Sequence, residues 1–270
     1  SRMNNEWQYH VVKGISWLVC RLPYKLILLI GASLGPLYGV IAKKQKLRGI
    51  KNIKIGMNMN DEQAEALIEK LFKNLGRSVM EILYMPNLTK KFINEHIEMR
   101  GVEHLDNAIK EDKGVIVLTG HVGNWEWMGA ALAAHGYPST TIVKKQPNAQ
   151  FTRFMNEYRE MVGQKVAYNR GEHGLLAISR ILKEKKLLGV LYDQDTNDDG
   201  VDLKLFGKDS IIPLGAAALS RIYGSPVLQC FIHNSEEGGC TVKIYPPLYT
   251  PKSKDREKDF YDVTQELVVI

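Results

Sequence analysis

Apolar residues recur along this 270-residue chain in two alternating patterns. Short apolar, β-branched runs bounded by glycine or polar residues predict buried strands, whereas apolar residues three and four positions apart predict helices. The predicted strands cover residues 115–118, 140–143, 187–192, 227–232 and 242–245. Helical patterns lie between most of them, near residues 148–161, 172–184 and 214–223. This alternation predicts an α/β fold with a mostly parallel or mixed central sheet flanked by helices.

Two further helices are predicted towards the N-terminus. Residues 61–84 carry one apolar stripe behind Asp61, which predicts a core-facing amphipathic helix capped by that aspartate. Residues 26–42 form a run of 17 positions without a charge. A membrane-spanning helix needs about 20 residues, with a lower limit near 17. The run therefore fits a helix that spans a bilayer, one that lies in the interface, or one that packs on the domain.

Charge is distributed unevenly. Residues 1–60 hold ten Lys and Arg against Glu6 alone, a net charge of +9, so the remaining residues sum to −3. A basic segment on a mildly acidic body points to an anionic surface. If residues 26–42 span a membrane, the six Lys and Arg at 43–54 predict that the end of the helix next to them lies on the cytoplasmic side. Nucleic acid is a poor alternative, since no aromatic stacking platform and no recognised motif accompanies the basic residues.

Three cysteines, Cys20, Cys230 and Cys240, are too few and too far apart for a structural zinc site or a disulfide framework. They fit a reducing compartment. No Walker loop, dinucleotide fingerprint or Gly-x-Ser-x-Gly elbow is present, so nothing indicates nucleotide hydrolysis, hydride transfer or a serine hydrolase.

The candidate chemistry follows the strand at 115–118, in the segment Gly120-His-Val-Gly-Asn-Trp-Glu126. Asn124 suits a helix N-cap, with Glu126 in the first turn. Residues five apart in one helix do not share a face, so we expect His121 to lie in the turn and fold back to meet Glu126. Gly123 permits a tight turn, and the N–H groups near Gly123 and Asn124 can then receive a developing oxyanion.

The same spacing also fits a hydrogen-bonded core histidine followed by an ordinary first-turn acid. The position of His121 favours chemistry, because ligand sites in open α/β sheets lie beyond the carboxyl ends of strands.

Two other places carry candidate binding residues. Arg159, among aromatic residues on the predicted helix 148–161, fits either a bidentate phosphate contact or a surface residue with a buried stem. The stretch Asp193-Gln-Asp-Thr-Asn-Asp-Asp-Gly200 follows another predicted strand. It fails as a calcium loop, because Asp198 stands where glycine should be and Lys204 where the bidentate glutamate should be. Asp193 and Gln194 fit either a loop that orients a hydroxyl or sugar, or a turn built from Asx residues.

The block from His121 to Glu126 resembles the His-x4-Asp/Glu motif of the glycerolipid and lysophospholipid acyltransferase superfamily. Its wording is most similar to the late acyltransferases of lipid A biosynthesis, the lauroyl and myristoyl transferases. Further similar segments follow in the family's order: 74–81, Arg159, 192–195 and 203–207. A single Phe precedes Gly207 where the family often has two, and residues 211–215 replace a Thr-Pro-containing turn. These departures bear on acyl-chain and acceptor preference more than on reaction class.

This resemblance implies a glycerol-3-phosphate acyltransferase-like fold and transfer of an acyl chain from acyl carrier protein to a hydroxyl of a lipid A precursor. His121 would be the general base and Glu126 its partner. The residues assigned to substrate binding are Gly123, Asn124, Arg159, Asp193 and Gln194. The mechanism requires no metal and no bound cofactor, only the acyl carrier protein thioester as co-substrate.

Charge and hydropathy, together with the resemblance, predict an organisation of the chain. Residues 1–55 would be a basic, hydrophobic membrane-anchoring leader, and residues 56–270 an acyltransferase domain on the cytoplasmic side of the bacterial inner membrane. The apparently helical pattern runs to Ile270 without a stop signal, so we expect a truncated C-terminus. Two alternatives remain: a lysophospholipid or glycolipid acceptor, and a non-catalytic membrane-surface lipid-binding protein.

Overall fold

The computed structural model describes residues 6–143, 147–168, 171–193, 200–205, 208–213, 215–235 and 238–268. Contacts divide the chain into two compact units, and each is described by itself. Unit 1 comprises Ser1–Tyr9, Leu88–Leu205 and Asp209–Ile270, and unit 2 comprises His10–Asn87 with residues 206–208.

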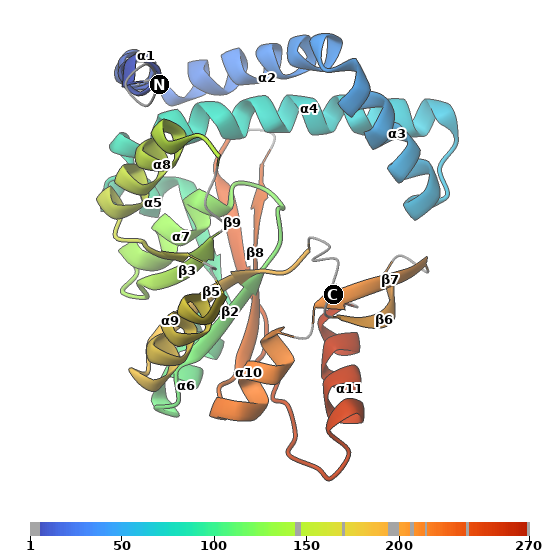
Figure 1. Ribbon diagram of the computed structural model, residues 1–270. Helices are drawn as coiled ribbons and strands as arrows, with labels where there is room; N and C mark the ends of the chain where they lie inside the picture. Colours follow the sequence, from blue (N-terminus) through green and yellow to red (C-terminus); the bar gives the residue numbers. More distant parts are fainter. Residues whose placement is uncertain are drawn as a thin grey trace. The chain divides into compact units, whose positions relative to one another are not determined.

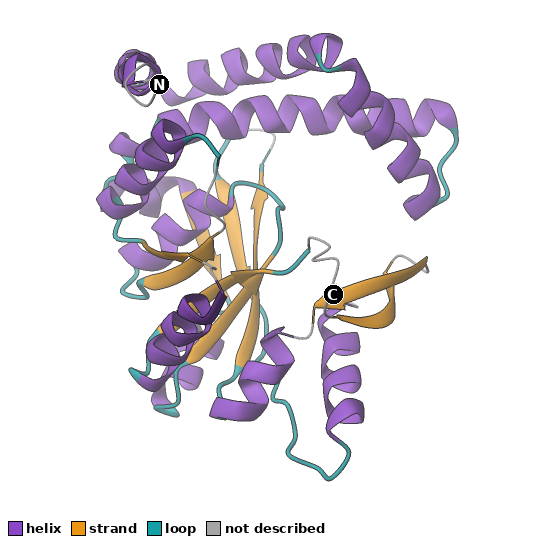
Figure 2. Ribbon diagram, in the orientation of Figure 1, coloured by secondary structure: helices purple, strands orange, loops and turns teal. Residues whose placement is uncertain are grey.

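Unit 1 is built on a mixed sheet of seven strands among the described residues, in the order β1-β9-β8-β2-β5-β3-β4 (Figures 1 and 2). The strands are β1 (Ile97–Arg100), β2 (Val115–Thr119), β3 (Ser139–Val143), β4 (Lys165–Tyr168), β5 (Leu187–Leu191), β8 (Val227–Asn234) and β9 (Cys240–Ile244). Every pairing is parallel except that of β8 with β9. Two further strands, β6 (Gly200–Leu205) and β7 (Lys208–Pro213), form a separate pair.

The helices of unit 1 connect and cover these strands. They are α5 (Lys90–His96), α6 (Val102–Lys110), α7 (Trp125–Ala134), α8 (Ala149–Met161), α9 (Gly171–Lys183), α10 (Gly215–Tyr223) and α11 (Arg256–Val268). The predicted α/β class and mixed sheet are therefore confirmed, as are the five predicted strands and the three predicted helices between them.

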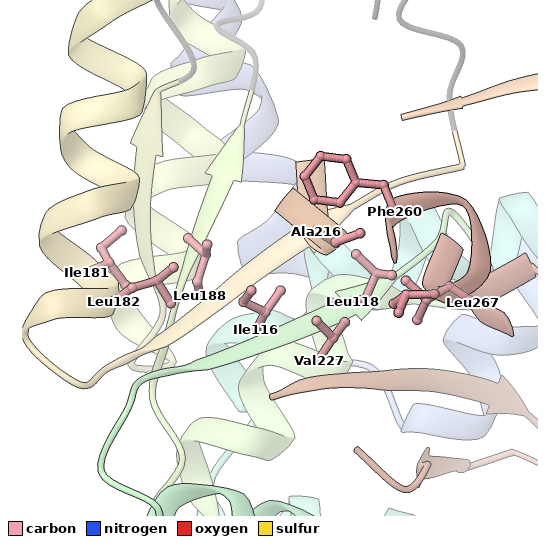
Figure 3. Packing of buried hydrophobic residues seen from close by; sticks show 11 residues of the cluster. Ile116, Leu118, Ile181, Leu182, Leu188, Ala216, Val227, Phe260 and Leu267 are labelled. Carbon is pink, nitrogen blue, oxygen red and sulfur yellow. The ribbon is translucent and has the colours of Figure 1, made fainter. Parts of the chain in front are cut away.

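The core of unit 1 surrounds β2. All five residues of this strand are buried, because helices cover both faces of a parallel sheet. Figure 3 shows Ile116 and Leu118 of β2 against Leu188 of β5 and Val227 of β8. Side chains from α9, α10 and α11 close the cluster, among them Leu182, Ala216 and Phe260.

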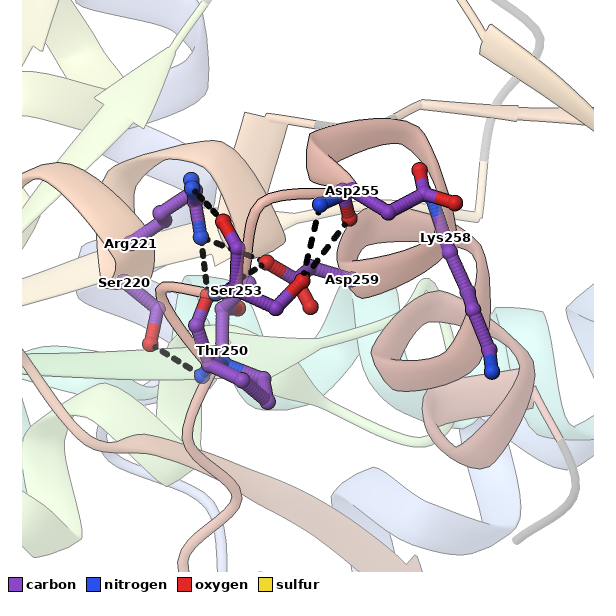
Figure 4. Close-up of polar contacts among 8 residues, drawn as sticks. Ser220, Arg221, Thr250, Ser253, Asp255, Lys258 and Asp259 are labelled. Carbon is purple, nitrogen blue, oxygen red and sulfur yellow. Dashed lines mark hydrogen bonds and ion pairs between the residues drawn. The ribbon is translucent and has the colours of Figure 1, made fainter.

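A polar cluster joins α10, the segment after β9 and the start of α11 (Figure 4). The Arg221 guanidinium donates to the carbonyl oxygen of Ser253 at 2.9 Å and to Asp259 at 2.5 Å. Asp259 also accepts the Ser253 backbone N–H at 2.9 Å. Asp259 is only 7% exposed, so these donors replace the water that its carboxylate loses on burial.

Unit 2 contains most of α1 (Glu6–Val19), all of α2 (Tyr24–Ile41), α3 (Lys43–Met57) and α4 (Asp61–Leu83), and the short 3-10 helix η1 (Met85–Asn87). The predicted helix 61–84 is confirmed, but its N-cap is Asn60 rather than Asp61. Asn60 and Gln63 bond reciprocally to each other's backbone N–H groups, an arrangement that satisfies two donors where an aspartate at the first helical position satisfies none. By length and composition alone, α2 could cross a membrane.

Candidate active site

The turn between β2 and α7 carries the predicted histidine. Residues 120–124 are not helical, so His121 lies in the turn as expected. Gly123 has a φ of +61°, and a Cβ there would lie 2.3 Å from the carbonyl oxygen of Ile232. Only glycine fits this position. The Asn124 side chain accepts the backbone N–H of Trp127 at 3.2 Å, which confirms its predicted role as the N-cap of α7.

His121 pairs with Asp193, which follows β5. The Nδ1 atom of the ring lies 2.7 Å from Oδ1 of Asp193, and the His121 backbone N–H donates to Oδ2 at 2.6 Å. Strands β2 and β5 are parallel neighbours with Thr119 opposite Leu191, so both residues leave the same end of the sheet. A Cβ on Gly120 would lie 2.9 Å from Oδ2 of Asp193, so a larger residue there would displace this carboxylate.

This pairing sets the tautomer of the imidazole. An ionised aspartate can only accept hydrogen bonds, so Nδ1 of His121 carries the proton and Nε2 keeps its lone pair. The Trp125 ring meets the imidazole edge to face at a centroid distance of 4.8 Å, which further limits its rotation. The side chains of His121 and Asp193 remain 33% and 35% exposed, so a substrate can reach them.

Glu126 does not meet His121, and the predicted His121–Glu126 pair is wrong. Among the described residues, the Glu126 carboxylate bonds to Arg159 of α8 through Nε at 2.9 Å and Nη2 at 2.6 Å. Glu126 is 3% exposed and Arg159 17%, so this is a buried, bidentate ion pair. The reason lies in the helix start: α7 begins at Trp125 and directs Glu126 inward, while the turn directs His121 towards β5.

Burial alone would lower the pKa of the Arg159 guanidinium. The hydrogen bonds and the charge of Glu126 outweigh that effect and raise its pKa above the ordinary value. Arg159 therefore stays charged, and its charge is matched within the protein. Arg159 is therefore less suited to bind a phosphate group than the sequence predicted, since Glu126 already occupies two of its donor atoms.

A small cavity of about 40 Å³ lies beside this ion pair. Its lining is largely apolar and comes from β2, β3, β5 and α7, together with Arg159 and Gln164. Gln164 donates to the backbone carbonyl of Glu126 at 2.8 Å and thereby helps to fix the first turn of α7. The volume suits ordered water or a chain end rather than a complete acyl chain.

Three further predictions concern the Gly123 N–H group, Gln194 and metal binding. Among the described residues, the Gly123 N–H has no hydrogen-bond acceptor, so it is available to a ligand. Gln194 lies outside the described residues, as does the rest of the polar loop at 194–199. Within the described ranges, no group of three or more His, Cys, Asp or Glu could hold a metal ion.

Comparison with known proteins gives the family. Residues 1–269 match the profile of the bacterial lipid A biosynthesis acyltransferases. The chain belongs to this family. The phosphatidylinositol mannoside acyltransferase of Mycobacterium tuberculosis is 26% identical over 183 residues, which are 65% of this chain and 57% of that protein. This chain therefore spans a little under three fifths of the length of that relative.

Two lipid A relatives match over more of the chain. A lipid A biosynthesis acyltransferase of Haemophilus influenzae is 22% identical over 253 residues, covering 93% of this chain and 78% of the relative. The lipid A biosynthesis palmitoleoyltransferase of Escherichia coli is 22% identical over 240 residues, covering 87% and 77% respectively. The late lipid A acyltransferase resemblance drawn from residues 121–126 is thus confirmed at the level of the family.

Proposed function

We propose that this acyltransferase family member moves a fatty acyl chain from the thioester of acyl carrier protein to a hydroxyl group of a lipid acceptor. The observation that carries the proposal is the His121–Asp193 pair, which leaves a basic ring nitrogen at the carboxyl end of the central strands. A general base of this kind must hold a lone pair ready for an alcohol proton and have a carboxylate behind it.

The reaction divides into two proton transfers. Nε2 of His121 removes the proton from the acceptor hydroxyl as its oxygen attacks the thioester carbon, and Asp193 stabilises the resulting imidazolium. The N–H groups of Gly123 and Asn124 stabilise the oxyanion of the tetrahedral intermediate. When the carbon–sulfur bond breaks, the imidazolium returns the proton to the thiolate of the carrier.

Glu126 and Arg159 act indirectly in this scheme. Their ion pair fixes the first turn of α7 against α8, and thereby the N–H groups that precede it. We therefore move the orienting role predicted for Glu126 to Asp193, and we assign Arg159 to positioning rather than to free anion binding. Gln194 remains a predicted acceptor-binding residue. No metal and no bound cofactor takes part in this mechanism.

The acceptor is an anionic lipid or glycolipid. A lipid A precursor is the first candidate, because the whole-chain match is to that family. A glycolipid is the second, because the phosphatidylinositol mannoside acyltransferases also match 65–68% of the chain. We place the enzyme on the inner membrane of a bacterium, facing the cytoplasm, where anionic lipids attract basic segments.

The test is turnover of acyl carrier protein thioesters by purified protein, with a lipid A precursor, a lysophospholipid and a mannosylated glycolipid as acceptors. We expect His121→Ala to lower the rate about 10²- to 10⁴-fold, the usual contribution of a general base. His135→Ala is the control, because His135 is exposed at the C-terminal end of α7, about 15 Å along the helix from the β2–α7 turn. Unchanged turnover in His121→Ala would favour the non-catalytic lipid-binding alternative instead.

A further inference from the structure

Helix α2 combines a buried glycine face with an exposed apolar face. Its buried residues are Ile27, Leu28, Gly31, Gly35 and Gly39. The large apolar residues on the remaining surface are 41–77% exposed: Leu26, Leu29, Leu34, Leu37, Tyr38, Val40 and Ile41. At 100° per residue these two sets fall on opposite sides of the helix, except that Tyr38 lies at the edge of the buried set and contacts the Phe72 ring of α4. The exposed set is a contiguous apolar surface that a soluble helix would not present.

The glycine face lies directly on α4, its antiparallel neighbour within unit 2. A Cβ on Gly35 would lie 2.0 Å from the carbonyl oxygen of Phe72, and one on Gly76 would lie 2.0 Å from that of Gly31. The two backbones are therefore in contact along the middle of α2. Because α2 has 18 residues and Gly35 lies within one turn of its centre, the contact fixes which part of α4 accompanies that centre.

That part of α4 is charged. Lys73 is the residue beside Gly35, and Glu69 and Lys70 lie one turn before it. All three are exposed. A helix of 18 residues measures about 27 Å, close to the thickness of the hydrocarbon core. A spanning α2 would therefore carry Lys73 close to the bilayer centre and hold Glu69 and Lys70 within the hydrocarbon core. Charged side chains at that depth are strongly unfavourable. The α2–α4 contact is therefore incompatible with a spanning α2.

The adjoining helix supplies charge of one sign. No acidic residue occurs between residues 24 and 57, and α3 carries six Lys and Arg and buries none of its residues. Lys46 and Lys54 pair with Glu69 and Asp61 of α4. Lys43, Lys44, Arg48 and Lys51 have no ion pair with any described residue. Four unpaired cations directly after an exposed apolar helix suit the surface of an anionic bilayer.

We propose that α2 and α3 form a monotopic membrane anchor, in which α2 lies in the plane of an anionic bilayer surface instead of crossing it. The outward face of α2 enters the boundary between headgroups and acyl chains. The cations of α3 contact lipid phosphates, and the charged residues of α4 stay in water. This anchor is independent of the acyl-transfer chemistry, so either proposal can fail without the other.

Binding to preformed vesicles tests the anionic surface. We expect the full chain to float with phosphatidylcholine vesicles that contain about 30% phosphatidylglycerol, and to be released by salt. Each cation removed should weaken binding about fivefold. The variant Lys44→Ala/Arg48→Ala/Lys51→Ala should therefore bind about 10²-fold more weakly at low salt. Its matched control is Lys252→Ala/Lys254→Ala/Lys258→Ala, which removes the same charge from exposed residues of unit 1. Equal losses in the two variants would overturn the anchor.

Depth measurement tests the orientation. Leu26, Ser33 and Val40 are exposed and seven residues apart, so they share one face of α2. Each is replaced in turn by a labelled cysteine in a Cys20→Ser background and quenched by lipids with quenchers at known depths. Equal, shallow depths support the in-plane helix. A label at residue 33 near the bilayer centre, with shallow labels at 26 and 40, would show a spanning helix. A stable dimer that ignores vesicles would show that a second copy covers the surface.

Discussion

Asp193 accepts two hydrogen bonds from one residue, the ring and the backbone N–H of His121. Asp193→Asn keeps the shape of this side chain but removes its charge and one acceptor. We expect kcat to fall about 10²- to 10⁴-fold, because the imidazole then loses its preferred tautomer and the charge that stabilises its protonated form. Acyl transfer kinetics measure the loss. Asp262→Asn, on the exposed side of α11, serves as the control, and a twofold or smaller change in Asp193→Asn would remove Asp193 from the mechanism.

Substitutions in the Glu126–Arg159 pair are expected to change the stability of the protein more than its catalytic rate. Glu126→Gln leaves a buried guanidinium without its counter-charge. We expect a loss of about 2–4 kcal/mol in the free energy of unfolding, below the fully buried case because the Arg159 side chain is 17% exposed. Denaturant unfolding measures it. The double variant Glu126→Leu/Arg159→Met removes both charges and should recover most of that loss.

The single variants Glu126→Leu and Arg159→Met complete the double-mutant cycle. A loss in the double variant equal to the sum of their two losses would contradict the ion-pair assignment. Activity provides a second comparison, because a residue that only positions the first turn of α7 should affect kcat less than Asp193 does.

At this scale the sequence predicted the local geometry and missed the partner. The turn position of His121, the Asn124 cap and the need for Gly123 all follow from residues adjacent in the chain. Asp193 is 72 positions from His121, and the two meet only because β2 and β5 are parallel neighbours. Both strands were predicted, but their adjacency was not. The signal was nevertheless present, since an acid directly followed the second of two buried strands.

At the scale of elements, the contact between α2 and α4 makes a direct prediction. Gly35→Ala places a methyl group against the backbone of Phe72, so the helices must separate. We expect a destabilisation of about 1–3 kcal/mol, as for other overpacked contacts. Thermal unfolding followed by circular dichroism checks this.

The control is Gly56→Ala, in α3, where a Cβ would meet nothing within 4 Å. This substitution should stabilise by up to about 1 kcal/mol, because alanine favours the helix over glycine. Equal melting temperatures for the two variants would show that the close α2–α4 contact does not contribute to stability.

Two of the strands that the sequence missed share a physical cause. Strands β1 and β4 have four residues each and form the two edges of the sheet. Edge strands are short and mix polar with apolar residues, so their periodicity is weak. Strand β2, which is fully buried and rich in β-branched residues, gave a strong signal for the opposite reason. Strand β6 contains Leu203, part of a segment that was matched to a family motif without a structural prediction.

For the whole molecule, composition and contacts draw different boundaries. Charge and hydropathy separate residues 1–55 from the rest, whereas contacts group His10–Asn87. The difference is α4, whose composition is that of an ordinary amphipathic helix but whose backbone packs on α2. The composition of a segment indicates whether it faces solvent or lipid. Only the three-dimensional structure shows which segments pack on each other.

Two tyrosines of unit 1 predict how it responds to alkaline pH. Burial, followed by hydrogen bonds to Asp106 and Glu111, raises the pKa of Tyr137 and of Tyr249 to about 12. Both acids belong to α6 or its C-cap, while the tyrosines lie after α7 and after β9. The folded protein thus holds these two protons more tightly than the unfolded chain, whose tyrosines ionise near pH 10.

The sign of the effect follows from this difference. The contribution of both tyrosines to stability is complete below about pH 10 and is lost as the pH rises through about 12, so the melting temperature should fall over that interval. Thermal melts over this pH range measure the loss of stability, and tyrosinate absorbance measures the ionisation of the tyrosines. Tyr137→Phe/Tyr249→Phe should flatten the decline, because neither side chain can then release a proton. Tyr261→Phe, on an exposed position of α11, should leave the decline unchanged, and the same slope in all three proteins would exclude these tyrosines as its cause.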